Sequence, residues 1–157
     1  MKVVVIYDSM YGNTEKIARA IAGELGTLGS VEIFSVGQMS PEKLQGAGLL
    51  VVGSPTQKFR HTDAIKNFLH DIPSGALGGM NAAVFDTRIS AKILKLFGYA
   101  DKHIGNALRK KGANLIVAPQ GFMVKDMQGP LAEGEIERAR GWARGIIKVL
   151  NAQAGGE

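Results

Sequence analysis

Residues 2–25 read KVVVIYDSMYGNTEKIARAIAGEL, and this stretch decides the fold class. Its first part, Lys2–Tyr7, is β-branched and nearly all apolar, which is typical of a strand buried on both faces. Its last part, Asn13–Leu25, repeats apolar residues every three or four positions, which predicts a helix that Asn13 or Thr14 can cap. A buried strand that leads directly into an amphipathic helix favours an α/β fold.

The same alternation continues along the chain. Further strands are expected at Val31–Val36, Leu49–Val52, Ala82–Phe85 and Leu115–Ala118, the last interrupted by residues 119–121 and continued by Phe122–Val124. Helices are expected around Ile65–Ile72, at His103–Lys111, and along Ile136–Leu150. Right-handed crossovers leave few topologies for such a chain. We predict a three-layer α/β fold with a doubly wound, five-stranded parallel sheet of order 2-1-3-4-5.

The length of 157 residues fits one domain, expected over residues 1–152, with residues 153–157 as a flexible tail. The chain has no cysteine, which excludes disulfides, thiol nucleophiles, cysteine-bound zinc and iron–sulfur clusters. Any redox chemistry must therefore come from a bound organic cofactor.

The first apolar run, Val3–Tyr7, is too short for the core of a signal peptide. No stretch approaches the roughly 20 apolar residues of a membrane-spanning helix, so we expect a cytoplasmic protein without a membrane partner. The net charge is +5, but the basic residues are scattered and only Arg109-Lys110-Lys111 forms a cluster. This distribution disfavours nucleic-acid binding.

In a doubly wound sheet the ligand lies at the carboxyl ends of strands 1 and 3, which selects residues 8–14 and 53–62. The first loop gathers polar groups before a helix start and contains no Lys or Arg: Ser9, Met10, Tyr11, Gly12, Asn13 and Thr14. Gly12 allows a sharp turn. Free N–H groups at a helix start favour a phosphate, so we expect the loop to bind one.

Two segments carry a family resemblance. Ser9-Met10-Tyr11-Gly12-Asn13-Thr14 resembles the flavodoxin phosphate loop, [ST]-x-[ST]-G-N-T, and Gly53-Ser54-Pro55-Thr56 resembles the second flavin loop of the same superfamily. The resemblance implies a flavodoxin-like fold and noncovalent FMN. It places Ser9, Gly12, Asn13 and Thr14 at the phosphate and residues 54–60 beside the isoalloxazine. Tyr11 departs from the pattern, and Ser-Met-Tyr-Gly is also similar to WrbA-type NAD(P)H:quinone oxidoreductases.

The second loop supplies Ser54, Pro55, Thr56, Gln57, Lys58 and Phe59 as cofactor-binding candidates. Phe59 either shields a face of the flavin or packs on the following helix. His61 is interpreted as a helix-start residue rather than a catalyst, because no carboxylate partner is identifiable.

The third loop, Asp86-Thr87-Arg88, is expected at the pyrimidine edge of the flavin by the same resemblance. Arg88 either stabilises the reduced flavin near N1 and O2 or forms a salt bridge. Phe97 and Tyr99 could reach the site. Trp142, on the last helix, is interpreted as a packing residue.

The resulting hypothesis is an FMN-binding electron carrier that works between a reductase and an acceptor protein, as a monomer or homodimer. The alternative is an NAD(P)H-dependent FMN quinone reductase that acts on a small quinone. The lack of an evident acid–base pair favours the carrier, whereas the positive charge favours the enzyme because flavodoxins are typically acidic. A non-flavin binding module on the same fold is a third possibility. A response-regulator receiver is excluded because Gly53-Ser54 and Pro119 occupy the positions of its phospho-acceptor Asp and its Lys.

Overall fold

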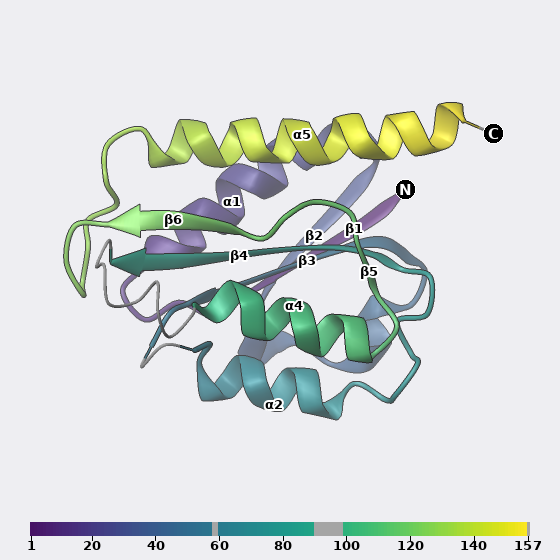
Figure 1. Ribbon diagram of the computed structural model, residues 1–157, viewed down its shortest axis with the longest axis horizontal. Coiled ribbons are helices and arrows are strands. Elements are labelled where there is room, and N and C mark those ends of the chain that lie inside the picture. Colours follow the sequence, from purple (N-terminus) through teal and green to yellow (C-terminus); the bar gives the residue numbers. More distant parts are fainter. Residues whose placement is uncertain (58–59, 90–98, 157) are drawn as a thin grey trace.

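The computed structural model describes residues 1–57, 60–89 and 99–156. A parallel sheet lies between two layers of helices (Figure 1). Its strand order is β2-β1-β3-β4-β5, with β6 also paired to β4. This order confirms the predicted doubly wound fold.

The strands are β1 (Lys2–Tyr7), β2 (Ser30–Ser35), β3 (Ala47–Pro55), β4 (Asn81–Ile89), β5 (Asn114–Leu115) and β6 (Gln120–Val124). The α-helices are α1 (Asn13–Leu25), α2 (Asp63–Asp71), α4 (Ala100–Lys110) and α5 (Glu135–Gly155). Short 3-10 helices occupy Gly26–Leu28, Val36–Gln38 and Pro41–Leu44. The fifth sheet position is thus divided between β5 and β6, with residues 116–119 outside both strands, close to the predicted interruption.

The sheet separates two apolar cores. Val3 and Val5 of β1 contribute to the core beneath α1 and α5, whereas Val4 and Ile6 contribute to the core beneath α2 and α4. Because successive side chains of a strand point to opposite faces, a strand covered on both sides must be apolar throughout. The partly buried Trp142 packs against the first core, with its ring centroid 6.2 Å from that of Phe85, as its interpretation as a packing residue requires.

Several elements are longer than predicted. β3 continues through Gly53 to Pro55, and β4 continues through the polar residues 86–88 to Ile89. Polar side chains at these strand ends remain in the sheet because β4 pairs there with β3 on one side and with β6 on the other. α4 starts at Ala100 rather than His103, and α5 continues through residues 153–155 of the segment expected as a tail.

Among the described residues, no helix combines the length and the apolar character that crossing a membrane requires.

Candidate functional site

A cavity of about 630 Å³ opens at the carboxyl ends of β1, β3, β4 and β6. This volume is in the range of small-molecule sites. The cavity is lined by Ser9, Met10, Tyr11, Asn13, Thr14, Pro55, Thr56, Gln57, Arg60, His61, Asp63, Thr87, Arg88, Ile89, Val124 and Met127. The crevice therefore forms at the predicted edge of the sheet.

Ten of the fifteen candidate residues line this cavity: Ser9, Met10, Tyr11, Asn13, Thr14, Pro55, Thr56, Gln57, Thr87 and Arg88. Gly12, Ser54 and Asp86 are not among its lining residues, and Lys58 and Phe59 lie outside the described residues, as does Phe97. Sequence reasoning missed Asp63, Ile89, Val124 and Met127. The topology offered a signal for Val124 and Met127, because strand five ends at the same edge of the sheet as strands one and three.

The first loop folds around the hydroxyl of Ser9. Gly12 has φ +87°, a left-handed conformation that favours glycine, and it precedes α1 directly. The backbone N–H groups of Gly12 and Glu15 donate to Ser9 Oγ at 3.1 and 3.4 Å. The expected caps were therefore wrong. Asn13 and Thr14 are already helical, and Ser9 supplies the oxygen that bonds the first turn.

The N–H groups of Asn13 and Thr14 have no acceptor among the described residues. They belong to the first turn of α1, where the aligned peptide dipoles favour an anion. The side chains are held in place beside them. Asn13 Nδ2 donates to the Gln128 carbonyl at 3.2 Å, and Thr14 Oγ1 lies 2.8 Å from Thr87 Oγ1. Each of these bonds leaves further donor capacity, because an amide has two N–H donors and each hydroxyl has one O–H.

Apolar side chains surround the mouth of the cavity. Met10, Tyr11 and Met127 are 57%, 50% and 72% exposed, and all three line the cavity. The side-chain amide of Gln57 contacts the Met10 sulfur, and the Asn13 bond holds the segment that carries Met127. This rim offers apolar surface to a flat ring or to a partner.

Thr56 and Ser54 hold the second loop to its neighbours. Thr56 N–H donates to the Thr87 carbonyl at 2.9 Å, and Ala100 N–H donates to Thr56 Oγ1 at 3.0 Å. The buried Ser54 Oγ accepts from Thr62 N–H at 3.1 Å. Ser54 therefore shapes the loop from behind, whereas Thr56 lies on the cavity wall.

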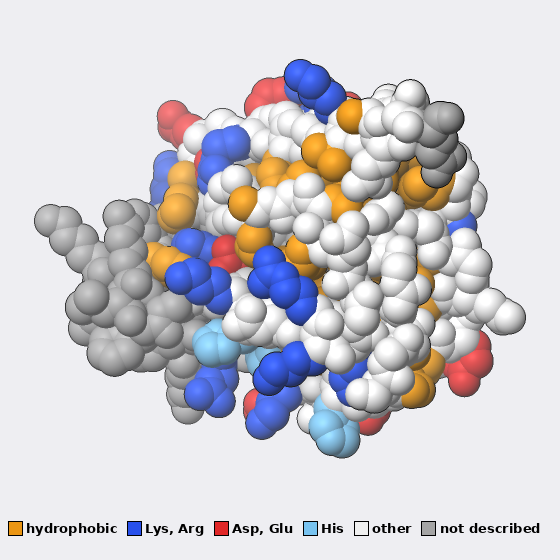
Figure 2. All heavy atoms as spheres, turned by 45° about the vertical axis from the view of Figure 1, so that its right-hand side comes forward, with side chains coloured by type: hydrophobic (Ala, Val, Ile, Leu, Met, Phe, Trp, Pro, Cys, Tyr) orange, Lys and Arg blue, Asp and Glu red, His pale blue; other side chains and the backbone are white. Residues whose placement is uncertain are grey.

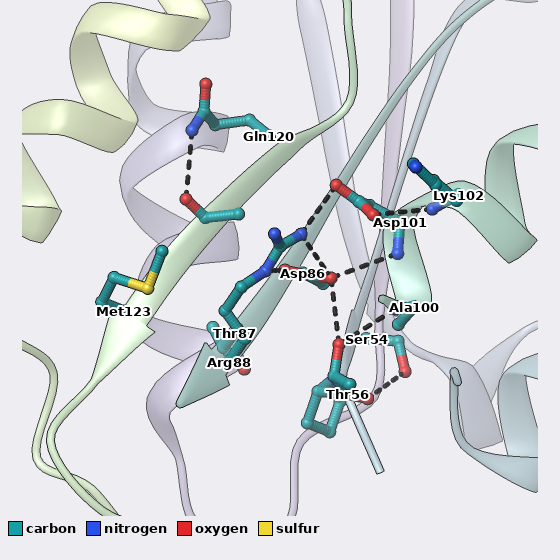
Figure 3. Close-up of polar contacts among 12 residues, drawn as sticks. Ser54, Thr56, Asp86, Thr87, Arg88, Ala100, Asp101, Lys102, Gln120 and Met123 are labelled. Carbon is teal, nitrogen blue, oxygen red and sulfur yellow. Dashed lines mark hydrogen bonds and ion pairs between the residues drawn. The ribbon is translucent and has the colours of Figure 1, made fainter. Parts of the chain in front are cut away.

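The third loop contains a compact ion-pair cluster of Asp86, Arg88 and Asp101 (Figure 3). Arg88 Nε lies 2.6 Å from Asp86 Oδ1, and Arg88 Nη2 lies 2.8 Å from Asp86 Oδ2 and 2.7 Å from Asp101 Oδ2. The Tyr99 ring stacks on the guanidinium, with 3.4 Å from Arg88 Cζ to the ring centroid. Of the two alternatives for Arg88, the structure shows the salt bridge.

His61 lies on the cavity wall beside the start of α2, and Thr62 caps this helix. The Nδ1 atom of His61 is buried and has no hydrogen-bond partner among the described residues. Burial lowers the pKa of the His61 imidazole. The His103 ring lies 6.0 Å away. Within the described part of the chain, no group of three or more His, Asp or Glu residues could hold a metal ion.

Comparison with known proteins places this site in context. The structure is similar to flavodoxin 2 from Bacillus cereus, with a TM-score of 0.81 and 25% identity over 94% of this chain and 99% of that chain. It is also similar to a WrbA-like flavodoxin from Agrobacterium tumefaciens, with a TM-score of 0.74 and 21% identity over 99% of both chains. Rubredoxin:oxygen oxidoreductase from Desulfovibrio gigas gives a TM-score of 0.77 and 24% identity over 98% of this chain and 37% of that chain.

No curated protein sequence matches the chain. The sequence does match the family described as Flavodoxin over residues 5–142, a range that contains all three loops of the cavity. With the sheet order and the position of the cavity in agreement, the chain belongs to the flavodoxin family.

Proposed function

We propose that this protein binds FMN noncovalently in the cavity and carries electrons between redox partner proteins. The family implies a flavin, typically FMN. The observation that carries the proposal is the pair of N–H groups of Asn13 and Thr14, which start α1 on the cavity wall and have no acceptor within residues 1–57, 60–89 and 99–156. These N–H groups suit a phosphate. They supply the attraction for the anion in a loop that contains no Lys or Arg.

The remaining walls also fit FMN. Ser9 would donate its hydroxyl to the phosphate, while Pro55, Thr56 and Gln57 would lie beside the flavin ring opposite Thr87. The apolar rim would shield the ring from water. Bound FMN supplies the electron chemistry, and the protein controls its environment and its access.

An NAD(P)H-dependent quinone reductase is the second candidate. The half-exposed Tyr11 on the rim and the net charge of +5 support it. A redox titration of the FMN-loaded protein separates the two functions: one-electron steps support the carrier, whereas a single two-electron step with NAD(P)H-driven quinone turnover supports the enzyme.

The phosphate assignment is tested by comparing the dissociation constants of FMN and riboflavin, which lacks the phosphate. We expect FMN to bind more tightly. Ser9→Ala should weaken FMN about tenfold or more, because it removes a hydrogen bond to a charged group, and should leave riboflavin binding nearly unchanged. Ser30→Ala, which changes an exposed serine at the start of β2, is the matched control. Equal affinities for FMN and riboflavin in the unmodified protein would contradict the assignment.

A further inference from the structure

The Asp86–Arg88–Asp101 cluster buries one more negative charge than positive charge. Asp86 has no exposed surface, Asp101 is nearly buried, and both carboxylates share the same Nη2 of Arg88. One guanidinium can neutralise only one carboxylate. An excess negative charge in a low-dielectric site is costly, and binding a proton at one carboxylate removes that cost.

This cluster lies directly behind the cavity wall. Arg88 and Thr56 line the cavity, and both bond to Asp86, which is itself not a lining residue (Figure 3). The Thr56 hydroxyl donates to Asp86 Oδ2 at 3.0 Å and accepts from Ala100 N–H. A charge that enters the cavity is therefore separated from Asp86 by the side chains of Arg88 and Thr56.

We propose that Asp86 takes up a proton when the bound cofactor is reduced, so that this carboxylate is the redox-linked proton site of the protein. The inference rests on the proposed function, in which a redox partner supplies the electron. The added electron makes the cavity more negative, and one proton from solvent binds the Asp86 carboxylate. The cluster then changes from a net charge of −1 to zero, and on reoxidation the proton returns to solvent.

The surroundings of Asp86 suit this role. The ionisable groups that face it are Arg88 on its own strand and Asp101 at the start of α4, and Arg138 of α5 acts on the far side of Arg88. Burial raises the pKa of Asp86 to about 6 although the ion pair with Arg88 lowers it, and the negative charge of Asp101 adds to the rise. A further negative charge in the adjacent cavity acts in the same direction.

Thr56 connects the proton to the cavity. A hydroxyl has one donor and two acceptor positions. When Asp86 Oδ2 carries the proton, it can donate to Thr56 Oγ1, which still accepts from Ala100 N–H. The Thr56 O–H is then released from Asp86 and can donate into the cavity, so protonation behind the wall changes a hydrogen bond at its surface.

The test uses the FMN-loaded protein, with its midpoint potential measured against pH and its reduced-minus-oxidised infrared spectrum recorded. We expect a break in the pH dependence and a new carbonyl band of a protonated carboxylic acid. Asp86→Asn should abolish both. Asp101→Asn, which retains the Asp86–Arg88 pair, should retain the band but shift the break to lower pH, because a negative neighbour is removed. Asp71→Asn removes an exposed carboxylate at the end of α2, outside both the cavity and the cluster, and should leave both signals in place.

A break and a band that persist in Asp86→Asn would overturn the inference while FMN binding and electron transfer stand. A pH break that Asp101→Asn does not move would overturn it as well, and this second variant serves if Asp86→Asn fails to fold. A protein that binds no FMN fails the affinity measurement above and overturns the proposed function and this inference together.

Discussion

At the scale of single residues, Gly53 is required by packing rather than by a turn. A Cβ at this position would lie 2.0 Å from the ring of Phe85, within the core beneath α1 and α5. Gly53→Ala should lower the free energy of unfolding by about 1–3 kcal/mol, because an overpacked core must shift. Urea unfolding measures the change.

The control is Gly23→Ala on the exposed side of α1, where an added Cβ meets nothing within 4 Å. That substitution should raise the free energy of unfolding by roughly 0.5–1 kcal/mol. Equal changes in the free energy of unfolding at both positions would show that the core accepts a Cβ beside the Phe85 ring without cost.

Asp86 gives the cofactor-free protein a particular pH dependence. Its pKa is raised from 3.8 to about 6 in the folded state, so between these values the folded protein binds more protons than the unfolded chain. Its contribution to stability is therefore present at low pH and is lost as the pH rises toward 6. Asn does not titrate. The free energy of unfolding of Asp86→Asn, relative to that of the wild type, should therefore be lower near pH 4 than near pH 7.

Thermal unfolding of both proteins across this pH range measures the difference. If the difference in Tm between the two proteins stays constant or changes in the opposite direction, the pKa of Asp86 is not raised in the folded state.

At the scale of elements, α5 carries two exposed glycines that the fold does not require. At Gly141 and Gly145 an added Cβ meets nothing within 4 Å. Replacing each by Ala should stabilise the protein by about 0.5–1 kcal/mol, because Gly loses more backbone entropy on folding. The double variant should have a higher Tm and an unchanged affinity for FMN. A lower Tm would show that the folded protein cannot accept a side chain at these two positions.

The elements also show how far the sequence alone could predict the structure. Apolar periodicity located the strands and helices, because burial on one face or both dictates it. The ends of β3 and β4 were missed, since Ser54 and Asp86 look like loop residues until their partners are known. By contrast, Ser9, Asn13 and Thr14 could be assigned to the cavity from the sequence, because they follow a buried strand and precede a helix. The contacts of Asn13 with Gln128 and of Arg88 with Asp101 join distant segments that no local pattern relates.

At the scale of the whole molecule, the net charge of +5 predicts how small acceptors approach. Figure 2 shows Lys and Arg side chains spread over the face it presents, with few Asp and Glu side chains among them. The reduced, FMN-loaded protein should be oxidised by an anionic acceptor at a rate that falls with added salt, and by a cationic acceptor at a rate that rises, because salt screens attraction and repulsion alike.

Stopped-flow oxidation with two acceptors of opposite charge measures both trends. The same salt dependence for both acceptors would show that local charges at the cavity mouth, rather than the overall field, control the encounter.

The alternation of side chains at the end of β4 has a consequence for engineering. Thr87 points to the layer of α1, where it meets Thr14, whereas Asp86 and Arg88 point to the layer of α4, where they meet Asp101. Side chains that share no partner usually combine additively in free energy. Three consecutive positions of one strand thus place their side chains in two layers, so selection or design can change the Thr87–Thr14 contact separately from the Asp86–Arg88–Asp101 contacts.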